Sequence, residues 1–275
     1  MKSFGLIATL LFASGSLAAP GTEARRARNA EKIAIRSAGN RNSNLRFPAV
    51  DTDGSLTELT NNSYVQYSTN WAGAVLTGTG FNSVTGTIVV PKPTIPSGGN
   101  TQTTYYASAW VGIDGDTCAN AILQTGIDVG IKGSTYIYEA WYEWYPDYSY
   151  TFSGFAIAAG DSIKMTVKAN SKTSGTATIQ NLTTGKSTSH TFSSQSYSLC
   201  ETDAEWIVED FQSGSSLVAF ADFDEFVFTG AQATTTSGST VGVSGATIID
   251  IRQNNKVLTD CGTTGTSGVY CDYSG

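Results

Sequence analysis

Carboxylates, one glutamine and several tryptophans recur at alternate positions in four short stretches of the chain. Residues two apart in a β-strand point to the same face of a sheet. Each stretch, folded as a strand, would therefore present one face that bears acids, an amide or indole rings. These sets are Trp110 with Asp114, Gln124 with Asp128, Glu139 with Trp141 and Glu143, and Glu205 with Glu209.

The residues that most other catalytic sites require are missing from this chain. A Ser-His-Asp or Cys-His site needs a histidine, and the single one, His190, lies in the Thr-rich stretch STSHTF, remote from a nucleophile motif. A zinc site would lack its usual ligands, so we expect neither a metal nor a cofactor. No phosphate-binding loop occurs, and Gln124 stands in Gln-Thr-Gly where an aspartic peptidase needs Asp-Thr-Gly. Carboxylates and amides are the groups that remain.

The four stretches can act together only if they are neighbouring strands of one sheet. Their polar faces would then form a concave wall rich in acids and aromatic rings, which suits an extended polymer such as a peptide or a glycan. The alternative is that they are ordinary solvated outer faces. Such faces usually carry Ser and Thr, as residues 174–180 do here, so tryptophans beside several acids favour the groove.

The region after residue 62 has the pattern of an all-β protein. Residues with high strand propensity alternate with polar ones, clusters of Gly, Asn, Asp and Ser interrupt the runs, and no segment has a helical period. The pattern predicts strands at 161–169, 174–182, 186–192, 217–228 and 246–259, the last with a turn at Asn254–Asn255. Many short strands without helices predict a two-sheet antiparallel β-sandwich, a jelly roll of the concanavalin or lectin type.

The first 62 residues differ from the rest. Residues 1–18 combine a Lys, an apolar stretch and small residues at Ser16 and Ala18, which predicts a signal peptide and a secreted product. Residues 19–62 are basic, whereas residues 63–275 contain 18 Asp and Glu against 8 Lys and Arg. We interpret residues 19–62 as a propeptide of approximate boundary and residues 63–275 as the mature domain.

Charge suggests what the propeptide does. Residues 20–46 have a net charge of +5, while residues 63–275 have a net charge of −10. Opposite charges attract at neutral pH, so a Lys or Arg laid into the acidic groove would make the propeptide an intramolecular inhibitor. The alternative is a disordered arm without an inhibitory role.

Four cysteines in a secreted chain imply two disulfides with three possible pairings. Cys118–Cys200 together with Cys261–Cys271 is favoured, because Cys261 and Cys271 flank a Gly- and Thr-rich turn.

Other partners are limited by composition. Asn61 and Asn181 begin glycosylation sequons, and Asn181 falls at a predicted hairpin tip, which makes it the better glycan site. The scarcity of Lys and Arg argues against nucleic acid as a partner, and no segment after the signal peptide is apolar enough to cross a membrane. We expect a monomer.

Five stretches of the chain resemble the fungal glutamic peptidases, the eqolisins. They read STNWAGAVL, YYASAWVGIDGDTC, AILQTG, AWYEWYPD and CETDAEWIVEDF, and the resemblance extends from about Tyr67 to about Asp250. The motifs are long and rich in tryptophan, and the order of signal peptide, basic propeptide and acidic enzyme also matches. The resemblance implies an acid endopeptidase that acts on polypeptides and is insensitive to pepstatin.

The resemblance also implies a catalytic pair. The family uses the glutamine of ILQTG and the second glutamate of EWIVED, which correspond to Gln124 and Glu209. Gln124 would donate to the oxyanion at any pH and orient the water, while Glu209 would take a proton from water and pass it to the leaving nitrogen. The expected groove residues are Trp71, Trp110, Asp114, Asp128, Glu139, Trp141, Glu143 and Glu205, with Glu139 at a position where the family commonly has Asp.

The cysteines match the family in part. Cys118–Cys200 corresponds to a family disulfide, whereas Tyr106 and Gly130 stand where the family has another cysteine pair. Cys261–Cys271 looks like a local addition.

Two other functions stay open from the carboxylates alone. A jelly-roll glycoside hydrolase would use two of Glu139, Glu143, Glu205 and Glu209 as acid and base. A carbohydrate-binding module would use Trp110 and Trp141 as stacking platforms. The resemblance and the basic propeptide, which a glycosidase seldom needs, favour the peptidase. Digestion of denatured casein in acid, compared with release of reducing sugar from glucans, separates these functions.

Overall fold

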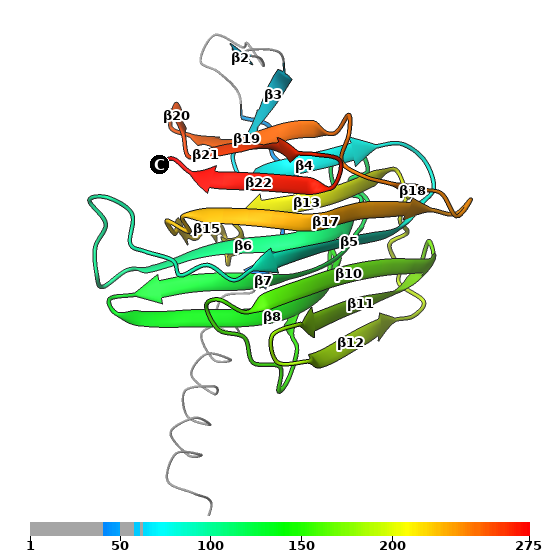
Figure 1. Cartoon of the computed structure of the whole chain (residues 1–275), viewed down its shortest axis with the longest axis horizontal. Coiled ribbons are helices and arrows are strands. Elements are labelled where there is room, and N and C mark those ends of the chain that lie inside the picture. Colours follow the sequence, from blue (N-terminus) through cyan, green and yellow to red (C-terminus); the bar gives the residue numbers. More distant parts are fainter. Residues whose placement is uncertain (1–40, 50–57, 61–62) are drawn as a thin grey trace, which may run out of the picture. The chain divides into compact units, whose positions relative to one another are not determined.

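The computed structural model describes residues 41–49, 58–60 and 63–275 (Figure 1). The expected signal peptide, residues 19–40 of the expected propeptide and the Asn61 sequon lie outside the described residues. Within the described ranges the chain forms strands, turns and loops without an α-helix. No helix in this part of the chain is long and apolar enough to cross a membrane.

Two large sheets contain most of the strands. The first has eight strands in the order β12-β11-β10-β5-β17-β22-β21, with β18 beside β17. Its members are β5 (Phe81–Val89), β10 (Ser162–Ser171), β11 (Ser174–Asn181), β12 (Lys186–Phe192), β17 (Glu225–Thr235), β18 (Thr240–Val241), β21 (Thr259–Thr264) and β22 (Gly268–Tyr273).

The second sheet has eleven strands in the order β2-β3-β19-β4-β13-β6-β7-β8-β9, with β16 beside β6 and β20 beside β19. Its members are β2 (Glu58–Thr60), β3 (Ser63–Ser68), β4 (Trp71–Thr77), β6 (Thr104–Ile113), β7 (Ile122–Lys132), β8 (Thr135–Tyr145), β9 (Tyr150–Thr151), β13 (Asp203–Glu209), β16 (Ala219–Phe220), β19 (Thr247–Gln253) and β20 (Lys256–Val257). Most neighbours are antiparallel, while β3 with β19 and β16 with β6 are parallel.

A third, small sheet contains β1 (Arg41–Asn42), β14 (Gln212–Ser213) and β15 (Ser216–Leu217), in that order. It joins residues near the start of the described chain to the hairpin that follows β13.

The core lies between the two large sheets, because their strands alternate apolar and polar side chains. In β10, Ile163, Met165 and Val167 are buried and the residues between them are not. They pack in one cluster with side chains of the other sheet such as Val111 and Trp206. Strands of both sheets cross Figure 1 in nearly the same direction, as in an aligned sandwich. The predicted two-sheet β-sandwich is therefore confirmed.

The predictions for individual strands are confirmed in some places and wrong in one. The strands expected at 174–182 and 186–192 are β11 and β12, and Asn254 and Asn255 form a turn with φ of 50° and 61° between β19 and β20. The single strand predicted at 217–228 is wrong. Its residues are divided among β15, β16 and β17, because the chain crosses from the eleven-stranded sheet to the eight-stranded one through a turn at Asp224, where φ is 62°.

Both favoured disulfides are present, Cys118–Cys200 and Cys261–Cys271. The first joins the loop after β6 to the loop before β13, and the second links facing residues of β21 and β22. The Tyr106 and Gly130 positions face each other across β6 and β7. A Cβ added to Gly130 would meet the Tyr106 ring at 2.6 Å, so the ring occupies the space above the glycine.

Asn181 is a poor glycan site in this fold. Its side chain is buried, its Nδ2 donates to Asp161 Oδ2 at 2.8 Å, and its Oδ1 accepts from the Thr184 N–H at 2.9 Å. Because the nitrogen that would carry the sugar is buried and bonded, the structure argues against the predicted preference for this sequon.

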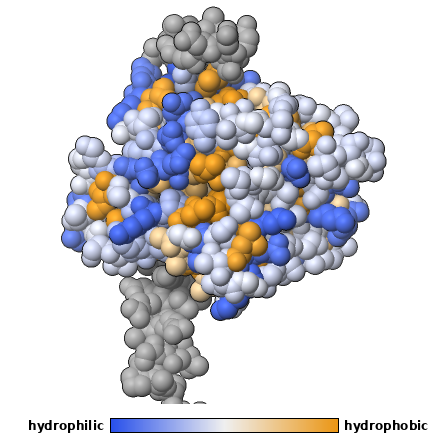
Figure 2. Space-filling view, in the orientation of Figure 1, coloured by the Kyte–Doolittle hydropathy of each residue, from blue (hydrophilic) through white to orange (hydrophobic). Residues whose placement is uncertain are grey.

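Some large apolar side chains remain exposed, among them Val89, Leu182 and Tyr197. Figure 2 shows hydrophobic groups near the middle of one face, framed by pale and blue residues. This face is therefore mixed in character rather than uniformly apolar.

Candidate active site

The four acid-bearing stretches lie side by side as β13, β6, β7 and β8 of the eleven-stranded sheet, as predicted. Their register places Gln124 between Gly112 and Glu143. It places Glu209 between Trp71 and Ser108. We call the face of these strands opposite the core the acidic face. Its acidic and amide side chains are Gln124, Asp128, Glu139, Glu143, Glu205 and Glu209.

Three tryptophans form the apolar part of the acidic face. Trp71, Trp110 and Trp141 are fully buried and pack with Ile207 and other aliphatic residues in a cluster separate from the core. Trp71 and Trp110 meet edge to face, with ring centroids 4.9 Å apart. The three rings are therefore part of a packed apolar cluster on the acidic face.

Residues 41–49 lie across the acidic face, and we call them the covering segment. They start as β1, which pairs with β14, and they continue to Ala49, whose N–H donates to the Tyr67 carbonyl at 3.0 Å. These residues belong to the expected propeptide. The segment buries side chains on a face that would otherwise meet solvent.

Arg41 inserts its guanidinium among the acids. It donates to Asp128 Oδ1 at 2.8 Å and to Ser108 Oγ at 3.0 Å, and it lies 3.8 Å from Glu143 Oε2. The guanidinium also lies over the rings of Trp141 and Phe211, at 4.1 and 4.4 Å from their centroids. A buried cation is tolerated here because both acids and rings surround it.

Glu209 is fully buried and accepts two hydrogen bonds. Trp110 Nε1 donates to Oε2 at 2.9 Å, and the Asn44 N–H donates to Oε1 at 3.1 Å. Burial raises the pKa of Glu209 to about 7, although the charge of Arg41, the Asn44 N–H, the Ser43 hydroxyl and the Trp110 N–H each lower it. Removal of water is thus the dominant influence on this carboxyl group.

Gln124 is also fully buried, yet its amide is unused. Neither Nε2 nor Oε1 has a hydrogen-bond partner among the described residues, and the same is true of Trp141 Nε1. A buried amide without partners is costly in a resting structure. Such groups are available to a bound molecule that offers a carbonyl or a water.

Glu143 connects Gln124 to Glu209. It is the direct cross-strand neighbour of Gln124, and its Oε2 lies 3.5 Å from the Ser43 nitrogen. Burial raises the pKa of Glu143 well above its ordinary value, Arg41 lowers it, and the charge of Glu209 raises it further. Glu143 thus lies beside Gln124 in the sheet and close enough to Glu209 for their charges to interact.

Asp114 departs from its expected place in the groove. It has φ of 69° just after β6, and its two carboxylate oxygens accept from the backbone N–H groups of residues 200–203 at 2.7 to 3.2 Å. The side chain therefore anchors the loop beside the Cys118–Cys200 disulfide instead of facing the covering segment.

Glu205 lies on the acidic face four residues before Glu209, but it has different neighbours. Among the described residues, no group lies in hydrogen-bonding geometry to either carboxyl oxygen of Glu205. Burial raises its pKa well above the ordinary value, and Asp203, Asp114 and Asp116 raise it further. The surroundings of Glu205 therefore favour its protonated form, although the backbone N–H of Asp116 lowers the pKa.

Sequence reasoning missed four residues of the site: Ser43, Asn44, Asn70 and Ser108. Ser43 and Asn44 lie in the expected propeptide, where only basic residues stood out. Ser108 faces both Glu209 and Asp128 across the strands. Asn70 directly precedes Trp71 in STNWAGAVL, so a signal existed in that motif but did not indicate a role.

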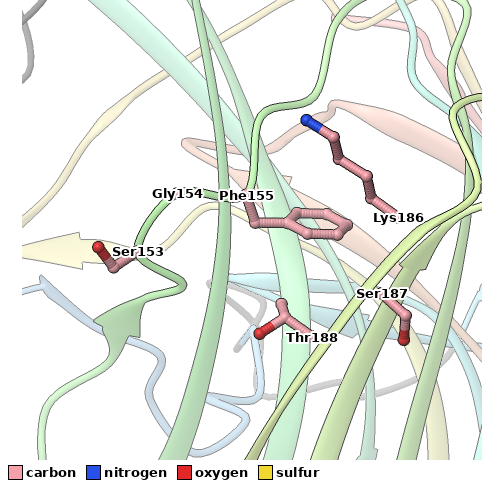
Figure 3. A pocket seen from close by; sticks show the side chains of 6 residues that line it. All are labelled: Ser153, Gly154, Phe155, Lys186, Ser187 and Thr188. Atoms are coloured by element: carbon pink, nitrogen blue, oxygen red, sulfur yellow. The ribbon is translucent and has the colours of Figure 1, made fainter.

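Other places in the described residues are less suited to chemistry. A hollow of 290 Å³ lies beside β12, lined by Ser153, Gly154, Phe155, Lys186, Ser187 and Thr188 (Figure 3). It contains no carboxylate. Asp114 lies near the sulfurs of Cys118 and Cys200, but these are joined in a disulfide and offer no thiolate.

His190 lies away from the acidic face. Its ring stacks on Tyr142, with centroids 4.1 Å apart, and Tyr142 packs against the core cluster. Burial lowers the pKa of His190. The single histidine is therefore placed on the opposite side of β8 from Glu143.

A model of the Peptidase A4 family matches residues 69–273, which include every strand that forms the acidic face. The chain belongs to the Peptidase A4 family. This membership confirms the resemblance to the eqolisins and decides against the glycoside hydrolase and the carbohydrate-binding module.

Similar members of the Peptidase A4 family include two fungal enzymes. Aspergillopepsin-2 of Aspergillus niger is 50% identical over 282 residues, covering 97% of this chain and 98% of that protein. Scytalidopepsin B of Scytalidium lignicola is 46% identical over 211 residues, covering 74% and 77%. A crystal structure of scytalido-glutamic peptidase with a transition state analog inhibitor is 46% identical, covers 74% of this chain and 98% of that chain, and has a TM-score of 0.68. The chain is accordingly a glutamic endopeptidase that acts in acid.

Proposed function

We propose that the enzyme cleaves peptide bonds with Glu209 and Gln124 as its catalytic pair. The observation that carries this proposal is the buried Gln124 amide, both of whose polar atoms lack a partner in the described residues, on the face where Glu209 is held by Trp110. A peptide carbonyl and a water supply the partners that this amide lacks.

The reaction follows from the two groups. The ionised Glu209 takes a proton from a water, whose oxygen then forms a bond to the carbonyl carbon of the substrate. The oxyanion accepts a hydrogen bond from Gln124 Nε2, which donates at any pH. The neutral Glu209 then gives its proton to the leaving nitrogen, the carbon–nitrogen bond breaks, and Glu209 is ionised again.

Removal of the covering segment prepares Glu209 for this role. Burial is the largest of the influences that raise the pKa of Glu209 to about 7. Water enters when the segment leaves, so this raising influence weakens, and Arg41, Ser43 and Asn44, which lower the pKa, leave at the same time. Trp110 remains beside Glu209, and its N–H continues to favour the ionised base.

The catalytic pair is tested by conservative substitutions. Glu209→Gln keeps the shape and removes the titrating group, so turnover of denatured casein in acid falls to background. Gln124→Ala loses about 10²–10³ in kcat, the usual loss for one oxyanion donor. Glu225→Gln, which changes an exposed acid in the other sheet, retains full activity. A Glu209→Gln enzyme with more than a few per cent of normal turnover would exclude Glu209 as the base.

We also propose that the covering segment keeps the precursor inactive and that the chain is secreted before it matures. The Asn44 N–H occupies Glu209 Oε1, and Arg41 pairs with Asp128. Arg46 pairs with Asp116 at 2.8 Å nearer the surface. Protonation of carboxylates in acid weakens these pairs and releases the segment. The signal-type sequence at 1–18 and the two disulfides support export.

A synthetic peptide of residues 20–49 tests this role. We expect it to inhibit the mature enzyme more strongly near pH 5.5 than near pH 3, and the Arg41→Gln peptide to inhibit at least about tenfold less. Salt weakens inhibition only modestly, because the Arg41 pair is buried and poorly screened. Equal inhibition by both peptides would show that charge at Arg41 does not hold the segment. The N-terminal sequence of the secreted enzyme tests export and the maturation site.

A further inference from the structure

Asn70 forms a pair of hydrogen bonds to the backbone of the covering segment. Its Nδ2 donates to the Leu45 carbonyl at 3.1 Å, and its Oδ1 accepts from the Phe47 N–H at 2.9 Å. Asn70 is fully buried. Since an amide side chain has one donor side and one acceptor side, it matches two backbone groups of an extended peptide.

The partners of Asn70 are main-chain groups, so the contact does not depend on the sequence that is bound. Thr69 and Trp71, the residues on either side of Asn70, also bond to main-chain groups of the covering segment. Trp71 Nε1 donates to the Asn44 carbonyl at 3.0 Å, and the Thr69 N–H donates to the Phe47 carbonyl at 2.8 Å. Any polypeptide that follows this path can form the same bonds.

Asn70 is held rigidly next to the proposed base. The Asp210 N–H, one residue after Glu209, donates to the Asn70 carbonyl at 2.9 Å. Ser68 Oγ lies 3.0 Å from Asn70 Oδ1 and fixes the orientation of the amide. A peptide held by Asn70 is therefore positioned relative to Glu209.

The direction of the covering segment shows which part of a peptide Asn70 would hold. The chain runs from Arg41 at Asp128, past Glu209 at Asn44, to Asn70 at Leu45 and Phe47. We propose that Asn70 is a substrate-binding residue that holds the backbone of a polypeptide on the C-terminal side of the bond that is cut. The inference rests on the proposed role of Glu209 in cutting at this place.

The test uses mature enzyme and two series of unlabelled peptides that share one cleaved bond. The first series has two residues before that bond and two to five after it, and the second has two to five residues before the bond and two after it. In the normal enzyme kcat/KM, followed by chromatography of the products, rises about tenfold as the third and fourth residues are added after the bond, the size expected for two backbone hydrogen bonds.

Asn70→Ala removes this rise and leaves the rates on the shortest peptides and on the second series within about twofold. Asn120→Ala is the matched control, because Asn120 is an exposed asparagine whose Nδ2 donates to the Ser198 carbonyl. In the Asn120→Ala enzyme, kcat/KM depends on peptide length as it does in the normal enzyme. An Asn70→Ala enzyme with equal losses on all lengths, or with losses only on the second series, overturns the inference.

Asn70→Asp decides the question if the alanine variant does not mature. A protonated aspartic acid can still donate to the carbonyl, whereas its carboxylate cannot. The variant keeps the length dependence at low pH and loses it as the pH rises, while a length dependence that is the same at every pH contradicts the inference. Cleavage of the short peptides by the normal enzyme tests the proposed role of Glu209 separately. If the normal enzyme cuts none of them, the proposed function is contradicted, and not the role of Asn70.

Discussion

Trp110 acts on Glu209 through one hydrogen bond and on Trp71 through ring contact. Its Nε1 donates to Glu209 Oε2, and its ring meets Trp71 edge to face. A donor to a carboxylate favours the ionised form. The indole N–H therefore helps Glu209 to stay ionised in acid, while the ring keeps the surrounding cluster packed.

Trp110→Phe separates these two roles. The phenyl ring keeps most of the packing, but the loss of the donor raises the pKa of Glu209, one of whose lowering influences is the Trp110 N–H. The base is then ionised only at higher pH, so we expect the acid limb of the kcat/KM profile to move upward by about one pH unit and kcat to fall about tenfold. A pH–rate profile measures both.

Trp206→Phe is the matched control, because Trp206 Nε1 donates to the Thr85 carbonyl on the core side. It lowers thermal stability and leaves the acid limb in place. An acid limb that moves equally in both variants would contradict a direct effect of Trp110 on Glu209.

Single residues were predictable where a local motif defines them and not where distant backbone defines them. Gln124 and Glu209 stand in long motifs, so the sequence pointed to both. Asp114 has the same kind of motif, but its role depends on N–H groups of residues 200–203, which a sequence does not bring near. Asn70 was missed for the same reason, since its partners lie more than twenty residues earlier in the chain.

Between β6 and β7, an aromatic ring of one strand covers a glycine of the other. The Tyr106 ring covers Gly130, and it also lies near Phe211, with centroids 5.8 Å apart. Phe211 in turn contacts Arg41 of the covering segment. The pairing of these strands thus reaches the end of the acidic face through two rings.

Gly130→Ala tests this contact. The added methyl group would lie 2.6 Å from the ring, so the ring must move, and overpacking of this kind costs about 1–3 kcal/mol. We expect the free energy of unfolding, from urea titration, to fall by that amount. In a Tyr106→Ala background the same Gly130→Ala change costs less, because the clash with the ring is gone, and a double-mutant cycle measures this difference. An equal cost of Gly130→Ala in both backgrounds would mean that the clash lies elsewhere.

Elements were predictable where alternation continues without interruption. β10 and β11 alternate buried with more exposed residues along most of their length, and β12 alternates exposed with partly buried residues before the buried Phe192, so their pattern defined them. Residues 217–228 are also rich in strand-forming residues, yet they are divided among β15, β16 and β17, which belong to three different sheets. Composition does not reveal where a chain leaves one sheet for another, and so the prediction failed at that point.

The whole molecule contains several carboxyl groups that favour the protonated form. Burial is the first cause in each case: it raises the pKa of Asp250 to about 7, of Asp210 to about 8 and of Glu209 to about 7, and it raises those of Glu143 and Glu205 well above their ordinary values. In the unfolded chain these groups titrate near pH 4. Between about pH 4 and pH 8 the folded state binds more protons than the unfolded state, so the free energy of unfolding falls as the pH rises.

Asp250→Asn tests this dependence. The asparagine Oδ1 can accept the bonds from Thr259 Oγ1 and the Cys261 N–H that Asp250 Oδ1 accepts. The variant should unfold like the normal protein at pH 3 and be more stable by about 2–4 kcal/mol at pH 8, because it has no charge to bury. Urea titrations at both values measure the difference, with Glu225→Gln as the exposed control. A difference that is equal at both pH values would mean that protonation of Asp250 is not its cause.

The covering segment and the acidic face belong to one polypeptide, connected through residues 50–62. While that connection is intact, the effective concentration of the segment at the acidic face is fixed by the connecting chain and does not change with the amount of protein. One cut in residues 50–62 converts the segment into a separate molecule, which competes only at its actual concentration. A freshly cut sample therefore gains specific activity when it is diluted at constant pH, whereas an uncut sample does not. Assays over a hundredfold range of enzyme concentration distinguish cut from uncut enzyme. Because the cut segment must still dissociate, the first cut and the appearance of activity are separate events in time.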